Sequence, residues 1–407
     1  MLTAIFRRTR YRRFGPLALA VIVVDAVGYD RSAGAQSLAP ASALCGSSAA
    51  MPIAPPATAL PSEDASAAIS RFSFIVYGDT RGPYDGRALQ PDHEKVVESM
   101  LATVKARANG PDPVRFVLQT GDAVTDGRIA AQWNVSYSPL ISQITVGGDL
   151  SYYLTVGNHD VTIARVASDP DRIVGLCNYF AANARLIPPN GSAHRMRDYP
   201  SYGFGYGNTF FLTFDTAIID DTAQFSWVKG EVERLDRRRY PNVVVFVHDP
   251  PISSGPHGGP RLEPSAATLR AYFLPFFREH HVRLVLSGHD HLFEHWVERY
   301  SDASGGHRLD QIVTGGGGAP AYGYKGEPDL RDYLSEGIAE QLKVEHLVRP
   351  SSDARQNPLH FVIVSVNGEE IRVEVVGVDR GRGFAPYGGR TTAVLVDPAR
   401  SGRARRQ

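Results

Sequence analysis

The sequence predicts a layered α/β fold with mixed β-sheets. Short apolar runs typical of buried strands alternate with amphipathic segments of helical spacing. Near the C-terminus, His360–Val366 and Glu370–Val378 flank Asn367-Gly368, a strong signal for a β-hairpin. Five of the earlier strand-like runs end in a residue that can bind a metal ion, and ligands of such folds gather at the carboxyl ends of strands.

Hydrophobic periodicity places the elements in chain order. β-branched and aromatic runs predict strands at 72–77, 114–118, 152–156, within 202–215, and at 243–247, 282–286 and 312–314. Apolar residues three or four positions apart predict helices at 93–108, 173–182, 224–237 and 268–279. We therefore expect one ordered domain over residues 71–380.

The segments that flank this domain have a different composition. Residues 36–70 are rich in Ala, Pro and Ser without a periodic apolar pattern, and we expect a linker there. Residues 381–407 form a Gly- and Arg-rich C-terminal tail. Lys+Arg and Asp+Glu both total 43, so the charge balance gives no signal for nucleic-acid binding, and the sequence indicates no obvious protein partner.

Residues 1–35 have the pattern of a signal peptide. An arginine cluster precedes the apolar run Pro16–Val24, and Ala33-Gly34-Ala35 resembles a cleavage site ahead of Gln36. The run is too short to span a bilayer and ends at Asp25, so we expect no stable membrane anchor. The mature protein is therefore expected to begin near Gln36 and to be secreted or periplasmic.

The chain contains two cysteines, Cys45 and Cys177. They could pair in an oxidising compartment. Because Cys45 falls in the predicted linker, two free thiols are an equally good interpretation.

The stretch Leu286–His291, LSGHDH, presents two histidines two residues apart directly after a predicted strand. Such a pair suits two neighbouring metal ions, because each ring can reach a different ion. Four earlier strands also end in possible oxygen or nitrogen ligands. Taken together, the candidates at the strand ends are Asp79, Asp122, Asn158, His248, His289 and His291.

These blocks, GD (78–79), GD (121–122), GNHD (157–160), VH (247–248) and GHDH (288–291), resemble the calcineurin-like metallophosphoesterase superfamily. The segments 248–259 and 314–320 also resemble its purple acid phosphatase branch. The resemblance implies two mixed β-sheets packed face to face with helices outside. It also implies a two-metal centre between the strand ends.

The resemblance assigns a role to each candidate. Asp122 would bridge two ions, because a carboxylate has two oxygens to offer; Asn158, His248 and His289 would complete one ion's shell, and Asp79 and His291 would serve the other. Mixed nitrogen and oxygen ligands suit divalent or trivalent transition metals such as Mn, Fe or Zn. His159 would protonate the leaving oxygen and Asp160 would orient its ring. The expected substrate contacts are Arg81, Asn158 and His257, although His257 could equally be an exposed loop histidine.

Two positions depart from the family pattern. Arg81 stands where the family usually has a histidine ligand, and Thr125 stands where the purple branch has a tyrosine. A guanidinium has no lone pair for a metal, so we expect Arg81 to turn away from the ions. Its partner would be the substrate's phosphate or a nearby carboxylate such as Asp126.

The sequence therefore predicts an exported, metal-dependent hydrolase of phosphate mono- or diesters, with a two-metal-activated hydroxide and a histidine general acid. The alternative is a degenerate family member that binds a phosphorylated or carbohydrate ligand without turnover. The missing histidine at position 81 supports the alternative, whereas the presence of His159 and Asp160 favours the enzyme.

Overall fold

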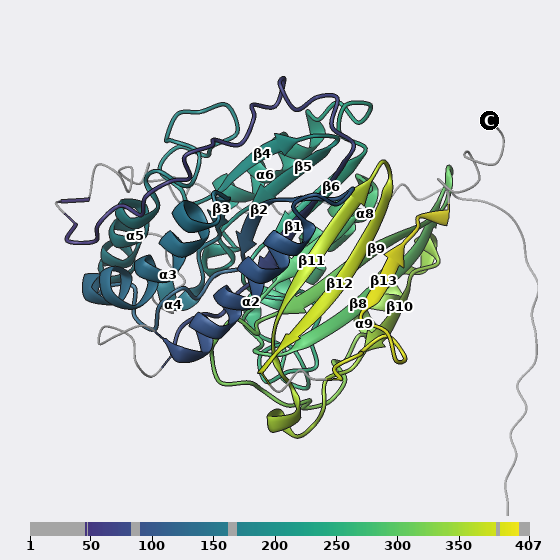
Figure 1. Cartoon of the computed structure of the whole chain (residues 1–407). Helices are drawn as coiled ribbons and strands as arrows, with labels where there is room; N and C mark the ends of the chain where they lie inside the picture. The colour runs from purple at the N-terminus through teal and green to yellow at the C-terminus, as the bar shows by residue number, and fades with distance from the viewer. Residues whose placement is uncertain (1–44, 47, 83–89, 162–168, 380–382, 399–407) are drawn as a thin grey trace, which may run out of the picture. The chain divides into compact units, whose positions relative to one another are not determined.

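Two mixed β-sheets form the framework of the computed structural model (Figure 1). The structure describes residues 45–46, 48–82, 90–161, 169–379 and 383–398, which belong to one compact unit. The predicted signal peptide lies outside the described residues. Within the described part of the chain, no helix combines the length and apolarity needed to cross a membrane.

The first sheet has six strands in the order β13-β12-β11-β1-β2-β3. β1, β2 and β3 run parallel, and β11 pairs antiparallel with β1. The predicted hairpin is confirmed, because β11 and β12 pair in register around a turn in which Gly368 has a φ of 63°. The strands are β1 (Arg71–Tyr77), β2 (Val114–Gln119), β3 (Ser151–Leu154), β11 (Leu359–Asn367), β12 (Glu370–Val378) and β13 (Thr392–Leu395).

The second sheet has seven strands in the order β10-β8-β9-β7-β6-β5-β4. Its centre is parallel, since β5, β6, β7 and β9 run in one direction. The sequence analysis did not predict β8 or β10, because their charged and aromatic residues obscure the period of two. The strands are β4 (Tyr202–Tyr206), β5 (Thr209–Thr213), β6 (Asn242–Phe246), β7 (Leu284–Ser287), β8 (Phe293–Asp302), β9 (Gly305–Thr314) and β10 (Lys343–Val348).

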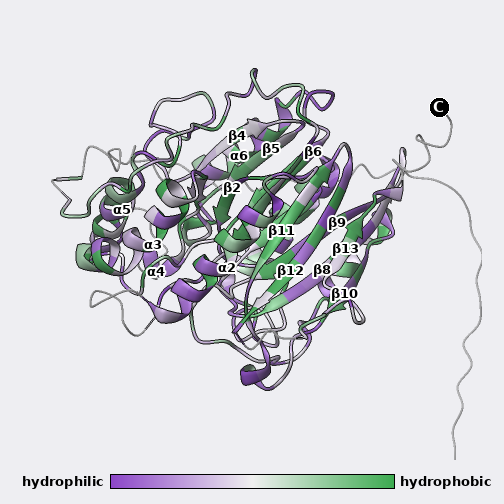
Figure 2. Ribbon diagram, in the orientation of Figure 1, coloured by the Kyte–Doolittle hydropathy of each residue, from purple (hydrophilic) through white to green (hydrophobic). Residues whose placement is uncertain are grey.

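The two sheets pack face to face through aromatic side chains. Phe74 and Phe116 stack on neighbouring strands of the first sheet, with ring centroids 5.3 Å apart. Each also meets Phe211 of the second sheet edge-on at 5.1 Å. Figure 2 shows hydrophobic residues concentrated along the strands. Burial of this apolar surface is the main contribution to the stability of the folded state. The two packed mixed sheets confirm the predicted fold class.

Helices cover the outer faces of both sheets (Figure 1). α2 packs on β11 and β12, while α6 and α8 bury Val228 and Phe277 against the second sheet. The predicted helix at 268–279 is longer and contains a π-helical turn at Leu269–Phe273. The α-helices are α2 (Pro91–Arg107), α3 (Ser138–Ser142), α4 (Asn158–Val161), α5 (Pro170–Asn183), α6 (Thr222–Glu233), α7 (Pro264–Thr268), α8 (Leu274–Glu279) and α9 (Arg331–Glu336).

The described part of segment 36–70 packs on the domain, so the prediction of a linker was wrong there. Ile53 is 2% exposed, and its backbone N–H donates to the Ala182 carbonyl at 2.9 Å. Glu63 accepts hydrogen bonds from the Tyr240 hydroxyl and the Gly205 N–H. A composition rich in Ala, Pro and Ser does not reveal such partners, because they lie far away in the sequence.

The domain also extends beyond its predicted end at residue 380. β13 pairs antiparallel with β12, and Tyr387 packs edge-on against Phe293.

At the other end, Cys45 and Cys177 form a disulfide across a sequence separation of 132 residues. Of the two interpretations, the structure shows the paired cysteines. The disulfide links the start of the described chain to α5.

Candidate metal centre

The predicted ligands meet where the carboxyl ends of strands from both sheets converge. Asp79, Asp122 and Asn158 follow the parallel strands β1, β2 and β3, while His248 and the pair His289 and His291 follow β6 and β7. Loops after parallel strands lie on the same edge of a sheet. Ligand atoms of Asp79, Asp122 and His248 lie within 4.8 Å of one another.

Three of these residues have backbone conformations that are uncommon for residues other than glycine. Asp79, Asp122 and His289 have φ angles of 58°, 54° and 67°. Such left-handed conformations cost free energy and cluster at functional sites. The surrounding backbone is also packed closely, because a Cβ on Gly157 would lie 2.3 Å from the Asp122 nitrogen, and one on Gly288 would lie 2.3 Å from Asp79 Oδ2.

On one side of Asp122 lie four side chains that can each donate an electron pair to a metal ion. We call this group the four-donor position; its members are Asp122, Asn158, His248 and His289. Asp122 Oδ1, Asn158 Oδ1 and His289 Nδ1 lie 3.3, 2.8 and 3.1 Å from His248 Nε2. Ligand atoms about 2.0–2.2 Å from a common ion are about 3 Å apart when adjacent in the shell. The spacing therefore fits one transition-metal ion.

The hydrogen bonds of the two rings leave these nitrogens with lone pairs. His248 Nδ1 lies 2.8 Å from the Thr120 carbonyl, which can only accept, so Nδ1 carries the proton. His289 Nε2 donates to Glu263 at 3.2 Å and lies 3.4 Å from Asp249. Such partners fix the tautomer of metal-binding histidines. With this tautomer, the His248 Nε2 lone pair has His289 Nδ1 and two oxygens within 3.3 Å, and such a set of atoms can bind a cation.

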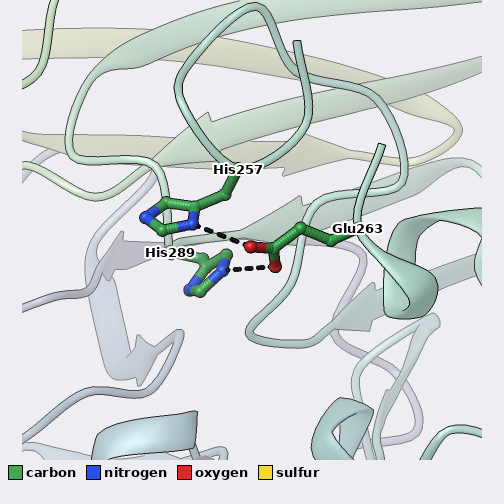
Figure 3. Close-up of side chains that lie close together, drawn as sticks. All are labelled: His257, Glu263 and His289. Carbon is green, nitrogen blue, oxygen red and sulfur yellow. Dashed lines mark hydrogen bonds and ion pairs between the residues drawn. The ribbon is translucent and has the colours of Figure 1, made fainter. Parts of the chain in front are cut away.

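Glu263 is a site residue that the sequence analysis missed. Figure 3 shows its carboxylate beside two rings, with one oxygen toward each. Oε1 lies 3.0 Å from His257 Nδ1, and Oε2 lies 3.2 Å from His289 Nε2. The rings of His257 and His289 lie 4.2 Å apart. Glu263 precedes α7 and has no motif around it, so no sequence signal indicated its role. His257 therefore lies beside the centre, and its role as a substrate contact stays a prediction.

The opposite side of Asp122 is what we call the Arg81 position, made of Asp79, Arg81, Asp122 and His291. Arg81 Nε donates to Asp122 Oδ2 at 3.0 Å, and Arg81 Nη2 lies 3.3 Å from His291 Nε2. The expectation that Arg81 turns away from the centre is therefore wrong. Two buried carboxylates need a compensating positive charge, and the guanidinium supplies it. Asp126, the alternative partner, pairs with Arg128 at 2.7 Å instead.

The remaining residues of the Arg81 position hold it closed. His291 Nδ1 donates to the Pro320 carbonyl at 2.8 Å, so Nε2 is free to accept from Arg81. Asp79 is fully buried, accepts the His289 backbone N–H at 2.9 Å, and lies 3.4 Å from His291 Nε2. The ring of Tyr322 stacks on His291 at 4.1 Å, and its side chain hydrogen-bonds with Arg81. These residues do not fit an ion as long as the guanidinium remains there.

Electrostatics follows from this arrangement. Burial opposes ionisation of Asp122, but electrostatic interactions with His248, His159 and Arg81 outweigh burial and lower its pKa. Burial also opposes the charge on His289, yet Asp249 and Glu263 outweigh it and raise the pKa of this ring to about 10. The four-donor position thus attracts a positive charge, whether a proton or a metal ion.

His159 lies at the start of α4, beside the four-donor position. Its backbone N–H donates to Asp122 Oδ1 at 3.0 Å, and Nδ1 donates to the Thr125 carbonyl at 2.8 Å. Asp160 does not orient this ring, contrary to expectation. Its carboxylate is fully buried and accepts the backbone N–H groups of Ala123, Val124 and Gly157. Asp160 therefore holds two strand exits together, and Thr125 fixes the ring of His159.

The two mixed sheets, with possible metal ligands where their strands end, are the arrangement that the resemblance to metallophosphoesterases implies. The family model for calcineurin-like phosphoesterases matches residues 72–293, more than half of the 407 residues. This chain is a member of the calcineurin-like phosphoesterase family, as its strand-end motifs predicted.

Two curated relatives of this chain are purple acid phosphatases. Purple acid phosphatase 1 of Ipomoea batatas is 27% identical over 152 residues, 37% of this chain and 30% of that protein. Purple acid phosphatase 22 of Arabidopsis thaliana is 23% identical over 299 residues, 60% of this chain and 66% of that protein. The match thus spans less than two thirds of either relative.

A purple acid phosphatase from yellow lupin (Lupinus luteus) seeds shares the fold. It has a TM-score of 0.55 and 17% identity, and the alignment covers 77% of this chain and 53% of that chain. At this identity the likeness concerns the fold alone.

Proposed function

We propose that this chain is a metal-dependent hydrolase of phosphate mono- or diesters. The observation that carries the proposal is that three possible metal ligands, Asp122 Oδ1, Asn158 Oδ1 and His289 Nδ1, lie within 3.3 Å of a fourth, His248 Nε2, at the four-donor position. A Mn, Fe or Zn ion held there would supply Lewis acidity to a phosphoryl oxygen and lower the pKa of water.

The side chains around this position have the chemistry that ester hydrolysis requires. His159, fixed at Nδ1 by Thr125, would donate a proton from Nε2 to the leaving oxygen. Arg81, 17% exposed in its side chain, and His257 would contact phosphate oxygens, and Asn158 would contribute its amide N–H₂. Together these groups bind the phosphate, orient it and supply a proton.

Hydrolysis of p-nitrophenyl phosphate and bis-p-nitrophenyl phosphate tests the proposal. We expect turnover of at least one ester with added Mn²⁺, loss after EDTA, and recovery when metal is restored. His248→Asn should abolish turnover, whereas His194→Asn, which changes a histidine paired with Glu231 on α6, should not. A protein that binds metal and phosphate but hydrolyses neither ester, nor any member of a broader phosphoester panel, would instead be a binding member of the family.

We also propose that the protein is exported. Besides the predicted signal peptide, the Cys45–Cys177 disulfide supports this proposal, because disulfides persist in oxidising compartments. Intact-mass measurement on protein from the native host should give a chain that begins near Gln36. Cytosolic protein that retains Met1 would contradict export.

A further inference from the structure

We propose that the guanidinium of Arg81 permanently replaces one metal ion, so that the centre holds a single ion at the four-donor position. The inference rests on the proposed function only for the identity of that remaining ion. The chain would then differ from the two-ion arrangement that its motifs predict. Asp122 would bridge an ion and an arginine.

The backbone places Arg81 beside Asp122. Asp79 N–H donates to the Gly121 carbonyl at 3.0 Å, and the N–H groups of Thr80 and Arg81 donate to the Asp122 carbonyl at 3.0 and 3.2 Å. Three consecutive hydrogen bonds fix the segment after β1 against the segment after β2. The Arg81 side chain therefore starts from a fixed point next to the carboxylate.

The guanidinium occupies the atoms that a second ion would need. Arg81 Nε bonds Asp122 Oδ2, while Asp122 Oδ1 lies 3.3 Å from His248 Nε2 in the four-donor position. Arg81 Nη2 meets the lone pair of His291 Nε2. The carboxylate thus divides its two oxygens between the two positions, as a carboxylate bridging two ions would.

Charge makes the replacement stable. Asp79 and Asp122 are both fully buried, and the guanidinium keeps its proton at any ordinary pH. A second ion within a few ångströms of this fixed charge would be repelled strongly in a site of low dielectric constant.

An outward rotation of Arg81 would lose its partners without an evident replacement. The side chain is 17% exposed, and both its carboxylate and its imidazole contacts lie on the buried side. Asp126, the acidic residue expected to receive it, is already bound by Arg128 Nη2 and Nε at 2.7 and 2.9 Å. Arg81 would therefore have to compete with an established ion pair.

The experiment counts the metal ions bound by the full-length mature protein. Wild type, Arg81→His, Arg81→Ala and the control Arg128→Ala are stripped with chelator, equilibrated with excess Mn²⁺, desalted and analysed by inductively coupled plasma mass spectrometry. We expect one ion in wild type and Arg128→Ala, and one additional ion in Arg81→His, because histidine offers a lone pair where arginine offers a charge. Arg81→Ala should also gain an ion, more weakly, and replaces Arg81→His if that variant does not fold.

Electron paramagnetic resonance of the Mn²⁺-loaded proteins provides a readout independent of activity. Wild type should give the hyperfine signal of an isolated Mn²⁺, and Arg81→His the exchange-coupled signal of two adjacent ions. Two ions in wild type, or no gain in the folded Arg81 variants, would overturn the inference. A wild type that binds no ion would also contradict the single-ion centre. If wild type binds one ion and Arg81→His binds two, but neither protein hydrolyses an ester, the inference stands and the proposed function fails.

Discussion

The two sides of Asp122 share one carboxylate but carry opposite chemistry. At the four-donor position two oxygens and His289 Nδ1 lie within 3.3 Å of His248 Nε2, and this set of side chains can bind a cation from solution. At the Arg81 position the cation is part of the chain. A row of ligand residues at strand ends therefore does not fix the number of ions. One neighbouring residue, arginine in place of histidine, changes what the same acids bind.

A second comparison shows how much position matters for a repeated pattern. Glu263 contacts both His257 and His289, and Asp302 contacts both His281 and His307; the ring centroids are 4.2 Å apart in both pairs. Glu263 is 22% exposed and supports a ring of the four-donor position, whereas Asp302 is 40% exposed at the end of β8. Glu263 contacts the predicted metal ligand His289, whereas the partners of Asp302 are not predicted ligands. Asp302 is therefore the control for Glu263.

Substitution of Asp122 should affect both positions at once and have the largest effect. Asp122→Asn removes the negative charge that serves the ion and Arg81 together. Since metal catalysis contributes several kcal/mol, we expect a loss of about 10³-fold or more in kcat/KM, and loss of the ion on dialysis. Asp126→Asn is the matched control, because Asp126 pairs only with Arg128 among the contacts described above. Retention of the ion by Asp122→Asn would contradict its bridging role.

Substitution of His159 should separate proton donation from metal binding. His159→Ala removes the proposed acid but leaves the four donor atoms in place. We expect kcat to fall about 10²–10⁴-fold for esters with poor leaving groups, and less for nitrophenyl esters, which need little protonation. Metal content should not change. An equal loss for every leaving group would argue against the role of His159 as an acid.

Substitution of Glu263 should weaken the four-donor position without removing a ligand. Glu263→Ala takes away the nearer of the two carboxylates beside His289 Nε2, and loss of such a partner of a metal-binding histidine lowers metal affinity about 10–100-fold. Titration of the metal-free protein with Zn²⁺ or Mn²⁺ measures the change. Asp302→Ala removes the equivalent carboxylate from the other histidine pair and should leave the affinity as it is; a loss in both variants would point to general destabilisation.

Substitution of Asp160 should have the smallest effect on chemistry and a clear effect on stability. The Asp160 carboxylate accepts hydrogen bonds from three backbone N–H groups. In Asp160→Asn, the side-chain N–H₂ group would face one of them and could not accept its hydrogen bond. An unsatisfied buried group costs about 1–3 kcal/mol, which urea unfolding can measure against the exposed control Asp171→Asn. Any loss of activity should be equal for all leaving groups, because Asp160 positions the loops rather than the proton on His159. A selective loss for poor leaving groups would restore the original assignment of Asp160 to the ring.

Most of the framework could be predicted from the sequence, because it depends on local patterns. The apolar runs before Asp79, Asp122 and His248 predicted their strands, and Asn367-Gly368 predicted the hairpin. The segments that failed were those without a period. The arm around Ile53 and the strand β13 are ordered by partners elsewhere in the chain, and composition alone gives no indication of such partners.

By itself, the sequence determined which side chains stand at the strand exits, since hydrophobic periodicity and turn residues are local and parallel strands bring their ends to one edge. Only the tertiary structure decided what those side chains contact. Arg81 and His291 are 210 residues apart and meet at 3.3 Å, and Glu263 reaches His289 across 26 residues. Such contacts depend on how two sheets and their loops pack in space, where charge balance between buried groups selects the partners.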